Sequence, residues 1–144
     1  MNTYDAEIVL YQASFLELKI RYQMRRLASL KAASGISGYH LEPTGVFGSK
    51  TNSKVADIVC EIIECEQELQ SLQTKQEKAK KVIRRLLHKA PLDDDTRQMF
   101  IDRFINSFKW RDVMARAGIS KTYMYKKRRE GLKIVQAFID GLNF

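Results

Sequence analysis

The stretch from Arg116 to Lys133 concentrates side chains whose chemistry suits contact with nucleic acid. It holds seven cations against one acid, with hydroxyl and aromatic groups among them. Lys and Arg contact phosphates, and hydroxyl and guanidinium groups at a helix start reach base edges in the major groove. The candidate DNA-binding residues are Lys121, Thr122, Tyr123, Tyr125, Lys126, Lys127, Arg128 and Arg129. The alternative is a solvated amphipathic helix whose basic face only keeps the protein in solution.

Other arrangements that could do chemistry are weaker in this sequence. His40 and His88 lie far from any group of Cys or carboxylates with ligand spacing, so we expect no metal site. Asp93, Asp94 and Asp95 are consecutive and point around a helix start, which favours capping over metal binding. The sequence contains no Gly-rich phosphate loop and no nucleophile motif. We therefore expect that this protein is not an enzyme and that it uses no cofactor and no small-molecule substrate.

A helix-turn-helix would position the basic stretch. One apolar face of a short helix is formed by Trp110, Val113, Met114 and Ala117. Gly118 follows where that helix must stop with positive φ, and Ser120 can cap the next helix. In the second helix Met124 and Leu132 are expected to point inward. The residues expected on its outer face are Lys121, Thr122, Tyr125, Lys126 and Arg129. Such a layout lets the outer face enter a DNA major groove.

The whole composition agrees with a helical protein that attracts polyanions. The chain has 144 residues with 44% hydrophobic and 29% charged residues, two Pro and seven Gly, and long stretches without a helix breaker. Its formal charge is +8, which makes double-stranded DNA the leading partner class. No apolar run reaches the length of a membrane span, and the first residues do not resemble a signal peptide. We therefore expect an all-α cytoplasmic protein with no membrane partner.

Two long helices are predicted before the helix-turn-helix. The first, at about 3–33, follows the alternating spacing of Ile8, Tyr11, Phe15, Leu18 and Tyr22. A loop at 34–51 is rich in Gly. The second helix, at about 53–89, carries a sustained 3.5-residue repeat typical of a coiled coil. Its stripe consists of Ile58, Ile62, Cys65, Leu69, Leu72, Gln76, Ala79, Ile83, Leu86 and Ala90. Gln76 either fixes the register of this stripe or reaches solvent.

Charge predicts how these two helices pair. Residues 55–69 have a net charge of −5 and residues 74–89 a net charge of +6, while the first helix changes from acidic to basic. An antiparallel hairpin sets opposite charges side by side, whereas a parallel dimer of the second helix stacks like charges. The residue before Pro91 ends the helix. We therefore predict a long antiparallel coiled-coil hairpin in residues 1–90 and a separate DNA-binding domain in residues 91–144.

The C-terminal domain should begin with a helix at about 93–106, and it ends in another apolar stripe. That stripe consists of Leu132, Val135, Phe138, Ile139 and Leu142. Most of it is expected to pack on Met99, Phe100 and Phe104, which supplies the core that this small unit needs. The alternative is a homodimer contact, which would bring two helix-turn-helix units to paired half-sites.

Residues 92–132 resemble the region-4 helix-turn-helix of bacterial sigma factors. The matching positions are Leu92, Trp110, Val113, Gly118, Ile119, Ser120 and Leu132. With the Gly-rich loop and the long second helix, the whole chain resembles the small late-transcription activators of phages of Gram-positive bacteria, the RinA and ArpU type. Three residues depart from the sigma pattern. Met114 stands where helix-turn-helix units usually have a small residue, which would make the crossing of the two helices looser or wider. Lys109 stands where a capping Ser is common, which shifts the cap to Ser107 or leaves it to water, and Gly131 replaces a helix-favouring Ala.

The resemblance implies a sequence-specific DNA-binding transcriptional regulator, an activator of phage late genes that acts with host RNA polymerase in the host bacterial cytoplasm. Two other functions stay open. One is a DNA-packaging recognition subunit similar to a phage small terminase, which would form closed rings. The other is an adaptor that binds RNA polymerase and does not read DNA, for which polyanion binding would be weak and indifferent to sequence.

Overall fold

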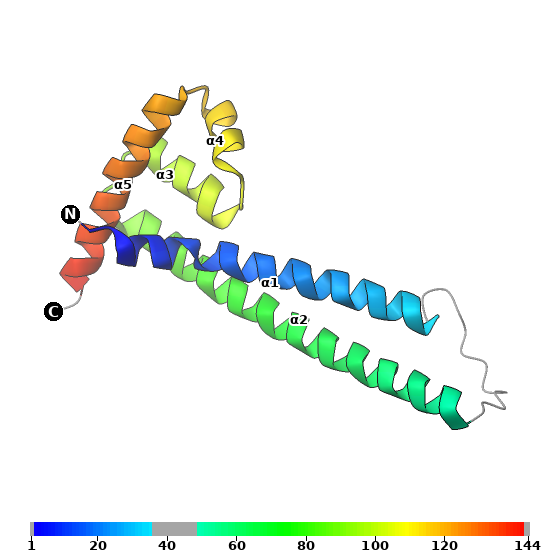
Figure 1. The fold of residues 1–144 in the computed structure, drawn as a ribbon. Helices are drawn as coiled ribbons and strands as arrows, with labels where there is room; N and C mark the ends of the chain where they lie inside the picture. Colours follow the sequence, from blue (N-terminus) through cyan, green and yellow to red (C-terminus); the bar gives the residue numbers. More distant parts are fainter. Residues whose placement is uncertain (1, 36–48, 143–144) are drawn as a thin grey trace. The chain divides into compact units, whose positions relative to one another are not determined.

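The computed structural model describes residues 2–35 and 49–142, and all secondary structure within them is helical. The elements are α1 (Tyr4–Ser34), α2 (Ser49–Lys89), α3 (Asp94–Phe100), the π-helical segment η1 (Ile101–Ile105), α4 (Trp110–Ala117) and α5 (Lys121–Leu142) (Figure 1). The predicted all-α class is confirmed for these residues. Most of the predicted loop at 34–51 lies outside the described residues, and α2 begins four residues earlier than expected. None of the described helices combines the length and apolarity needed to cross a bilayer.

The chain divides into two compact units, each built from parts of both long helices. The first combines Met1–Leu16 with Lys75–Phe144, and the second is Glu17–Thr74. In the second unit α1 and α2 contact each other: the Cys65 thiol donates to the backbone carbonyl of Gln23 at 3.3 Å, and Lys31 pairs with Glu66 at 3.6 Å. That ion pair is exposed, so its contribution to stability is small, about 0–1 kcal/mol. The apolar residues buried in this unit are Ile20, Ile62, Cys65 and Leu72.

The buried face of α1 is not the one that the spacing of its large apolar residues predicts. Phe15, Leu18 and Tyr22 are 56%, 64% and 60% exposed. The buried residues of α1 are Ala6, Leu10, Ala13 and Ile20. Both sets follow a helical stripe, but the stripe with Ala allows other elements to approach the backbone of α1 more closely. The helix predicted from this spacing is therefore present, but the larger side chains do not form its buried face.

The stripe predicted on α2 is buried or half-buried in both units. In the first unit the side-chain amide of Gln76 is buried and donates to the backbone carbonyl of Ala13 at 3.3 Å. This contact identifies Gln76 as a residue inside the α1–α2 interface rather than one that reaches solvent. Ile83, Leu86 and Ala90 follow along the stripe and are buried.

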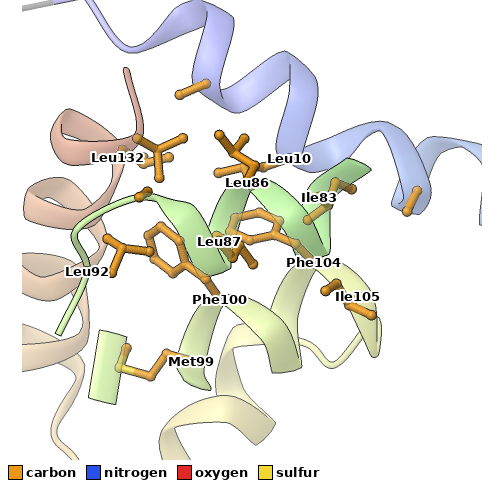
Figure 2. Close-up of a cluster of buried hydrophobic side chains, with 14 of the residues drawn as sticks. Leu10, Ile83, Leu86, Leu87, Leu92, Met99, Phe100, Phe104, Ile105 and Leu132 are labelled. Carbon is orange, nitrogen blue, oxygen red and sulfur yellow. The ribbon is translucent and has the colours of Figure 1, made fainter. Parts of the chain in front are cut away.

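The core of the first unit joins the start of α1 and the end of α2 to the C-terminal helices (Figure 2). Phe100 and Phe104 are fully buried and meet edge to face with ring centroids 5.3 Å apart. Tyr11 of α1 meets Phe104 in the same way at 5.0 Å. Aromatic pairs in this geometry contribute about 0.5–1.5 kcal/mol beyond the area they bury. The side chains that hold the C-terminal helices thus come from both ends of the sequence.

The link between α2 and α3 is fixed by a capping residue and by an arginine. Asp93 is the N-cap of α3 and accepts a hydrogen bond from the Thr96 amide at 3.4 Å, as predicted for this group of aspartates. The Arg97 guanidinium donates to the carbonyls of Leu87 at 2.9 Å and Leu92 at 2.8 Å, and more weakly to that of Ala90 at 3.4 Å. The bond to Leu87 satisfies a carbonyl that the end of α2 leaves without a helical partner, and the other two hold the link that follows the helix. The helix predicted at 93–106 is α-helical only to Phe100 and continues as η1.

Helix α5 is held to the rest of the unit along its second half. Leu132 and Val135 are buried in the same core as Met99, Phe100 and Phe104, so this part of the C-terminal stripe is internal, as the preferred interpretation predicts. Gln136 accepts a hydrogen bond from the Ala6 amide at 2.9 Å and therefore satisfies an amide in the first turn of α1. Leu142, at the far end of the stripe, is 66% exposed.

Candidate nucleic-acid interface

The turn between α4 and α5 depends on Gly118. Its φ and ψ are 66° and 36°, in the left-handed region that glycine adopts without steric cost. The amides of Gly118 and Ile119 both donate to the Met114 carbonyl, which closes the end of α4. The Ser120 hydroxyl then accepts from the Tyr123 amide at 3.2 Å and caps α5. The short helix, Gly turn and Ser cap that were predicted from sequence are therefore present.

The start of α4 is less completely capped. Lys109 is its N-cap and makes no side-chain hydrogen bond there. Ser107 has φ of 61°, which places it in the preceding turn, and it does not cap α4. The Lys109 carbonyl accepts from the amides of Asp112 and Val113. Of the two expectations for this position, the one that transfers the cap to Ser107 is wrong.

Six of the eight candidate DNA-binding residues lie in solvent. These are Lys121, Thr122, Tyr123, Tyr125, Lys126 and Arg129. Tyr123 and Tyr125 are 40% and 44% exposed, and the Lys121 ammonium lies 5.8 Å from the centre of the Tyr125 ring. Met124 faces the core and is 2% exposed. The first half of α5 therefore presents a continuous outer face that combines cations, hydroxyl groups and aromatic rings.

Lys127, a seventh candidate, is turned toward α3. Its ammonium lies 3.5 Å from an Asp93 carboxylate oxygen and 5.6 Å from the centre of the Tyr123 ring. Desolvation lowers the pKa of Lys127, but the charge of Asp93 and the interaction with Tyr123 together outweigh it and leave the pKa raised. The hydrogen bond with Thr96, aided by the charge of Lys127, lowers the pKa of Asp93. Both groups stay charged at neutral pH, so the Lys127 ammonium is occupied by an ion pair within the protein.

Arg128, the eighth candidate, is stacked against the start of α4. Its guanidinium carbon lies 5.4 Å from the centre of the Trp110 ring, and one terminal nitrogen donates to the Tyr11 hydroxyl at 3.4 Å. Arg103 of η1 lies 5.8 Å from the same Trp110 ring and 5.2 Å from the Tyr11 ring. The Nε atoms of both arginines and the indole nitrogen of Trp110 are buried without a hydrogen-bond partner among the described residues. Cation–π stacking therefore holds this part of α5 in place.

Ion pairs reduce the number of cations that are free to meet a polyanion. Arg116 lies 3.9 Å from Asp102 and stacks on Phe108 at 4.7 Å, and Lys127 is paired with Asp93. In the described part of the chain, the other five cations of this stretch have no carboxylate within ion-pair distance, and four of them are exposed. The exposed ones are Lys121, Lys126, Arg129 and Lys133. These four make the exposed side of α5 electropositive.

The sequence did not indicate that α1 takes part in supporting this surface. Tyr11 of α1 contacts Arg128 of α5, 117 positions further along the chain. Ala6 of α1 contacts Gln136 of α5, 130 positions further along. Helical spacing predicts which side of one helix is buried, but it contains no information on which distant residue covers that side. The signal that could have pointed to Arg128 is the neighbouring aromatic residue at the start of α4, since Arg commonly stacks on Trp.

Comparison with known proteins leaves the function to be argued from the site itself. The chain matches no family model, and searches among curated proteins and solved structures also find no match.

Proposed function

We propose that this protein is a sequence-specific DNA-binding transcriptional regulator that docks the first half of α5 in the major groove. The observation that carries the proposal is the exposed outer face of α5, which is held by the Gly118 turn and the Ser120 cap. On it Lys126 and Arg129 supply phosphate contacts, and Thr122 and Tyr125 supply groups that reach bases. In this interpretation α4, the turn and α5 form a helix-turn-helix similar to sigma region 4.

The core supports this assignment because the exposed cations are not needed to hold the fold. Met124, Leu132 and Val135 anchor α5, while Lys127 and Arg128 are engaged with other elements. Lys121, Lys126 and Arg129 remain without ion-pair partners among the described residues. A cationic surface whose charges are not offset by ion pairs within the protein fits a role in binding a polyanion.

The biological setting is proposed on the resemblance alone. It is activation of phage late genes together with host RNA polymerase, in the host bacterial cytoplasm. The paired segments of α1 and α2 then form a coiled-coil hairpin attached to the DNA-binding unit. A homodimer is part of the same proposal, and since Leu132 and Val135 are internal, its contact would use other apolar residues, such as Phe15 and Leu18 of α1. Light scattering on the full chain tests the dimer and also distinguishes it from the ring that a small-terminase function requires.

The central test measures DNA binding as a function of salt. Duplexes are first selected from phage genomic DNA with the full chain, and binding is then followed by fluorescence anisotropy between low and physiological salt. Replacing Lys126 and Arg129 together by Ala should reduce the slope of log affinity against log salt by about 1.8, or about 0.9 for each lost phosphate contact. The matched control replaces Lys19 and Arg25, two exposed cations of α1, by Ala.

Two results would contradict the proposal. An unchanged slope in the α5 variant would show that DNA does not meet this helix. Binding that is equally strong to every duplex would remove the claim that sequence is read, and would favour an adaptor that contacts RNA polymerase without reading DNA.

A Thr122→Ala change should alter which duplexes are preferred while leaving the salt slope almost unchanged, because Thr122 is assigned to bases rather than to phosphates.

A further inference from the structure

A cleft lies between the start of α1 and the middle of α5. Its volume is about 570 Å³, within the range of about 300–1,000 Å³ typical of ligand pockets. The residues that line it are Thr3, Glu7, Tyr125, Arg128, Arg129, Leu132 and Lys133. Leu132 is buried, and two of the others, Tyr125 and Arg129, also belong to the exposed face of α5. The cleft is therefore continuous with the candidate DNA-binding surface.

The charges around the cleft favour an anion. Three cations, Arg128, Arg129 and Lys133, stand against one carboxylate, that of Glu7. Within the described residues neither Arg129 nor Lys133 has a carboxylate at ion-pair distance, and Arg128 is held by stacking and by the Tyr11 hydroxyl. All three cations lie on α5, so this wall of the cleft carries a positive potential that the single carboxylate of Glu7 on the α1 side offsets only in part.

A second cleft in the same unit has the opposite character. It measures about 410 Å³ and lies between α3, η1 and the α4–α5 turn. Its charged residues are Asp95, Asp102 and Arg116, and Arg116 already pairs with Asp102. An anion gains nothing from this cleft, so of these two clefts only the one between α1 and α5 favours an anion.

We propose that the cleft between α1 and α5 binds a phosphate group, supplied by the backbone of the duplex that lies on the outer face of α5. The source of the phosphate rests on the proposed function. The planar guanidinium of Arg129 can meet two phosphate oxygens at once, whereas Lys133 acts as a point charge. The Thr3 hydroxyl lies on the opposite wall and can donate a further hydrogen bond. In this arrangement α1, which lies outside the helix-turn-helix, forms one side of the DNA site.

Glu7 sets the strength of this site. Its carboxylate lines the same cleft as the three cations and repels a phosphate that enters. Removing the charge should therefore strengthen binding, which is the reverse of what is expected for an acid that only stabilises the fold. At a separation of roughly 7 Å in water the expected gain is about threefold at low salt, and it should shrink as salt is added.

The experiment compares Lys133→Gln and Glu7→Gln with controls that make the same charge changes outside the cleft, Lys81→Gln and Glu77→Gln on α2. Each full-length variant is titrated with the selected duplex at several salt concentrations. Lys133→Gln should reduce the salt slope by about 0.9 and Glu7→Gln should raise the affinity, while both controls stay close to wild type. In a second arm, inorganic phosphate and a nucleoside triphosphate are tested without DNA by the change in tryptophan fluorescence, since Arg128 contacts both the cleft and the Trp110 ring.

The outcomes separate this inference from the proposed function. If Lys126→Ala weakens DNA binding but Lys133→Gln and Glu7→Gln leave it unchanged, the proposed function stands and the DNA backbone is not the ligand of the cleft. Binding of free phosphate or nucleotide that Lys133→Gln abolishes would then identify the second source. If neither variant changes binding in either arm, the cleft is not a phosphate site and the inference is overturned. Failure of the full chain to bind any duplex overturns the proposed function, and the second arm still decides the cleft.

Discussion

The close approach of α5 to α3 at Gly131 can be tested by a single added methyl group. A Cβ atom at this position would lie 2.5 Å from Phe100 Cζ and 2.8 Å from Thr96 Cγ2. Both neighbours are buried, and the Phe100 ring is confined by Phe104 and Trp110 at centroid distances of 5.3 and 6.5 Å. The ring therefore cannot move aside without disturbing the core.

The magnitude follows from two opposing effects of Gly131→Ala. Alanine favours an interior helical position over glycine by about 1 kcal/mol. Overpacking a tight core costs about 1–3 kcal/mol, and a contact this short belongs in the upper part of that range. The free energy of unfolding should therefore fall by about 1–2 kcal/mol. For a domain of this size about 1 kcal/mol corresponds to roughly 4 °C, so the midpoint should fall by about 4–8 °C.

The assay is thermal unfolding followed by circular dichroism at 222 nm, with Gly141→Ala as the matched control. Gly141 lies on the same helix, and a Cβ added there meets no atom of the described residues within 4 Å. Only the helix preference acts at that position, so the control should melt at or slightly above the wild-type temperature. If Gly131→Ala also melts at or above wild type, α5 does not pack against α3 as closely as described, and the reasoning is refuted.

Two further predictions concern the link between α2 and α3. Arg97→Met should lower the free energy of unfolding, measured in urea, by about 2–3 kcal/mol, because the carbonyls that Arg97 satisfies lose charged donors. Arg97→Lys should recover only part of this loss, because a lysine cannot reach several carbonyls at once. Full recovery by lysine would show that charge alone matters. Asp93→Asn keeps a capping side chain but loses the charge near Lys127. Because the Thr96 hydrogen bond and Lys127 lower the pKa of Asp93, ionised Asp93 stabilises the fold above its unfolded pKa of about 3.9, and that stability is lost as pH falls through the folded pKa. The gap between wild type and Asp93→Asn should thus be constant from pH 5 to 8 and close in more acidic solution, and a gap that persists at pH 2 would contradict this cause.

Local features of the candidate site could be predicted from the sequence because each depends on residues close together in the chain. Gly118 is required by its own backbone conformation, and Ser120 caps the helix that starts at the next residue. Asp93 caps α3 for the same local reason. The direction of Met124 toward the core follows from helical periodicity. These predictions need no knowledge of which elements meet in space.

The remaining features depend on contacts between distant residues, which spacing alone does not contain. Lys127 and Arg128 carry the charge expected of DNA contacts, but Asp93 and Trp110 engage them from other elements. Gly131 was expected to be only a weak point in a helix, whereas its missing side chain leaves the room that Phe100 occupies. On α1 two apolar stripes compete, and the choice between them is made by the shape of the surfaces that pack against the helix.

The hydrogen bond between the Ala6 amide and Gln136 has a consequence for how the protein matures. A ribosome releases the first turns of α1 long before it adds the residues that receive them, since the two positions are 130 residues apart. Closing so long a chain segment is entropically costly, and such contacts form late. The nascent chain must hold α1 exposed, or transiently paired elsewhere, until translation has passed α5. The unit that carries the candidate DNA site is therefore expected to be completed last, and a ribosome stalled before Gln136 would carry no finished site.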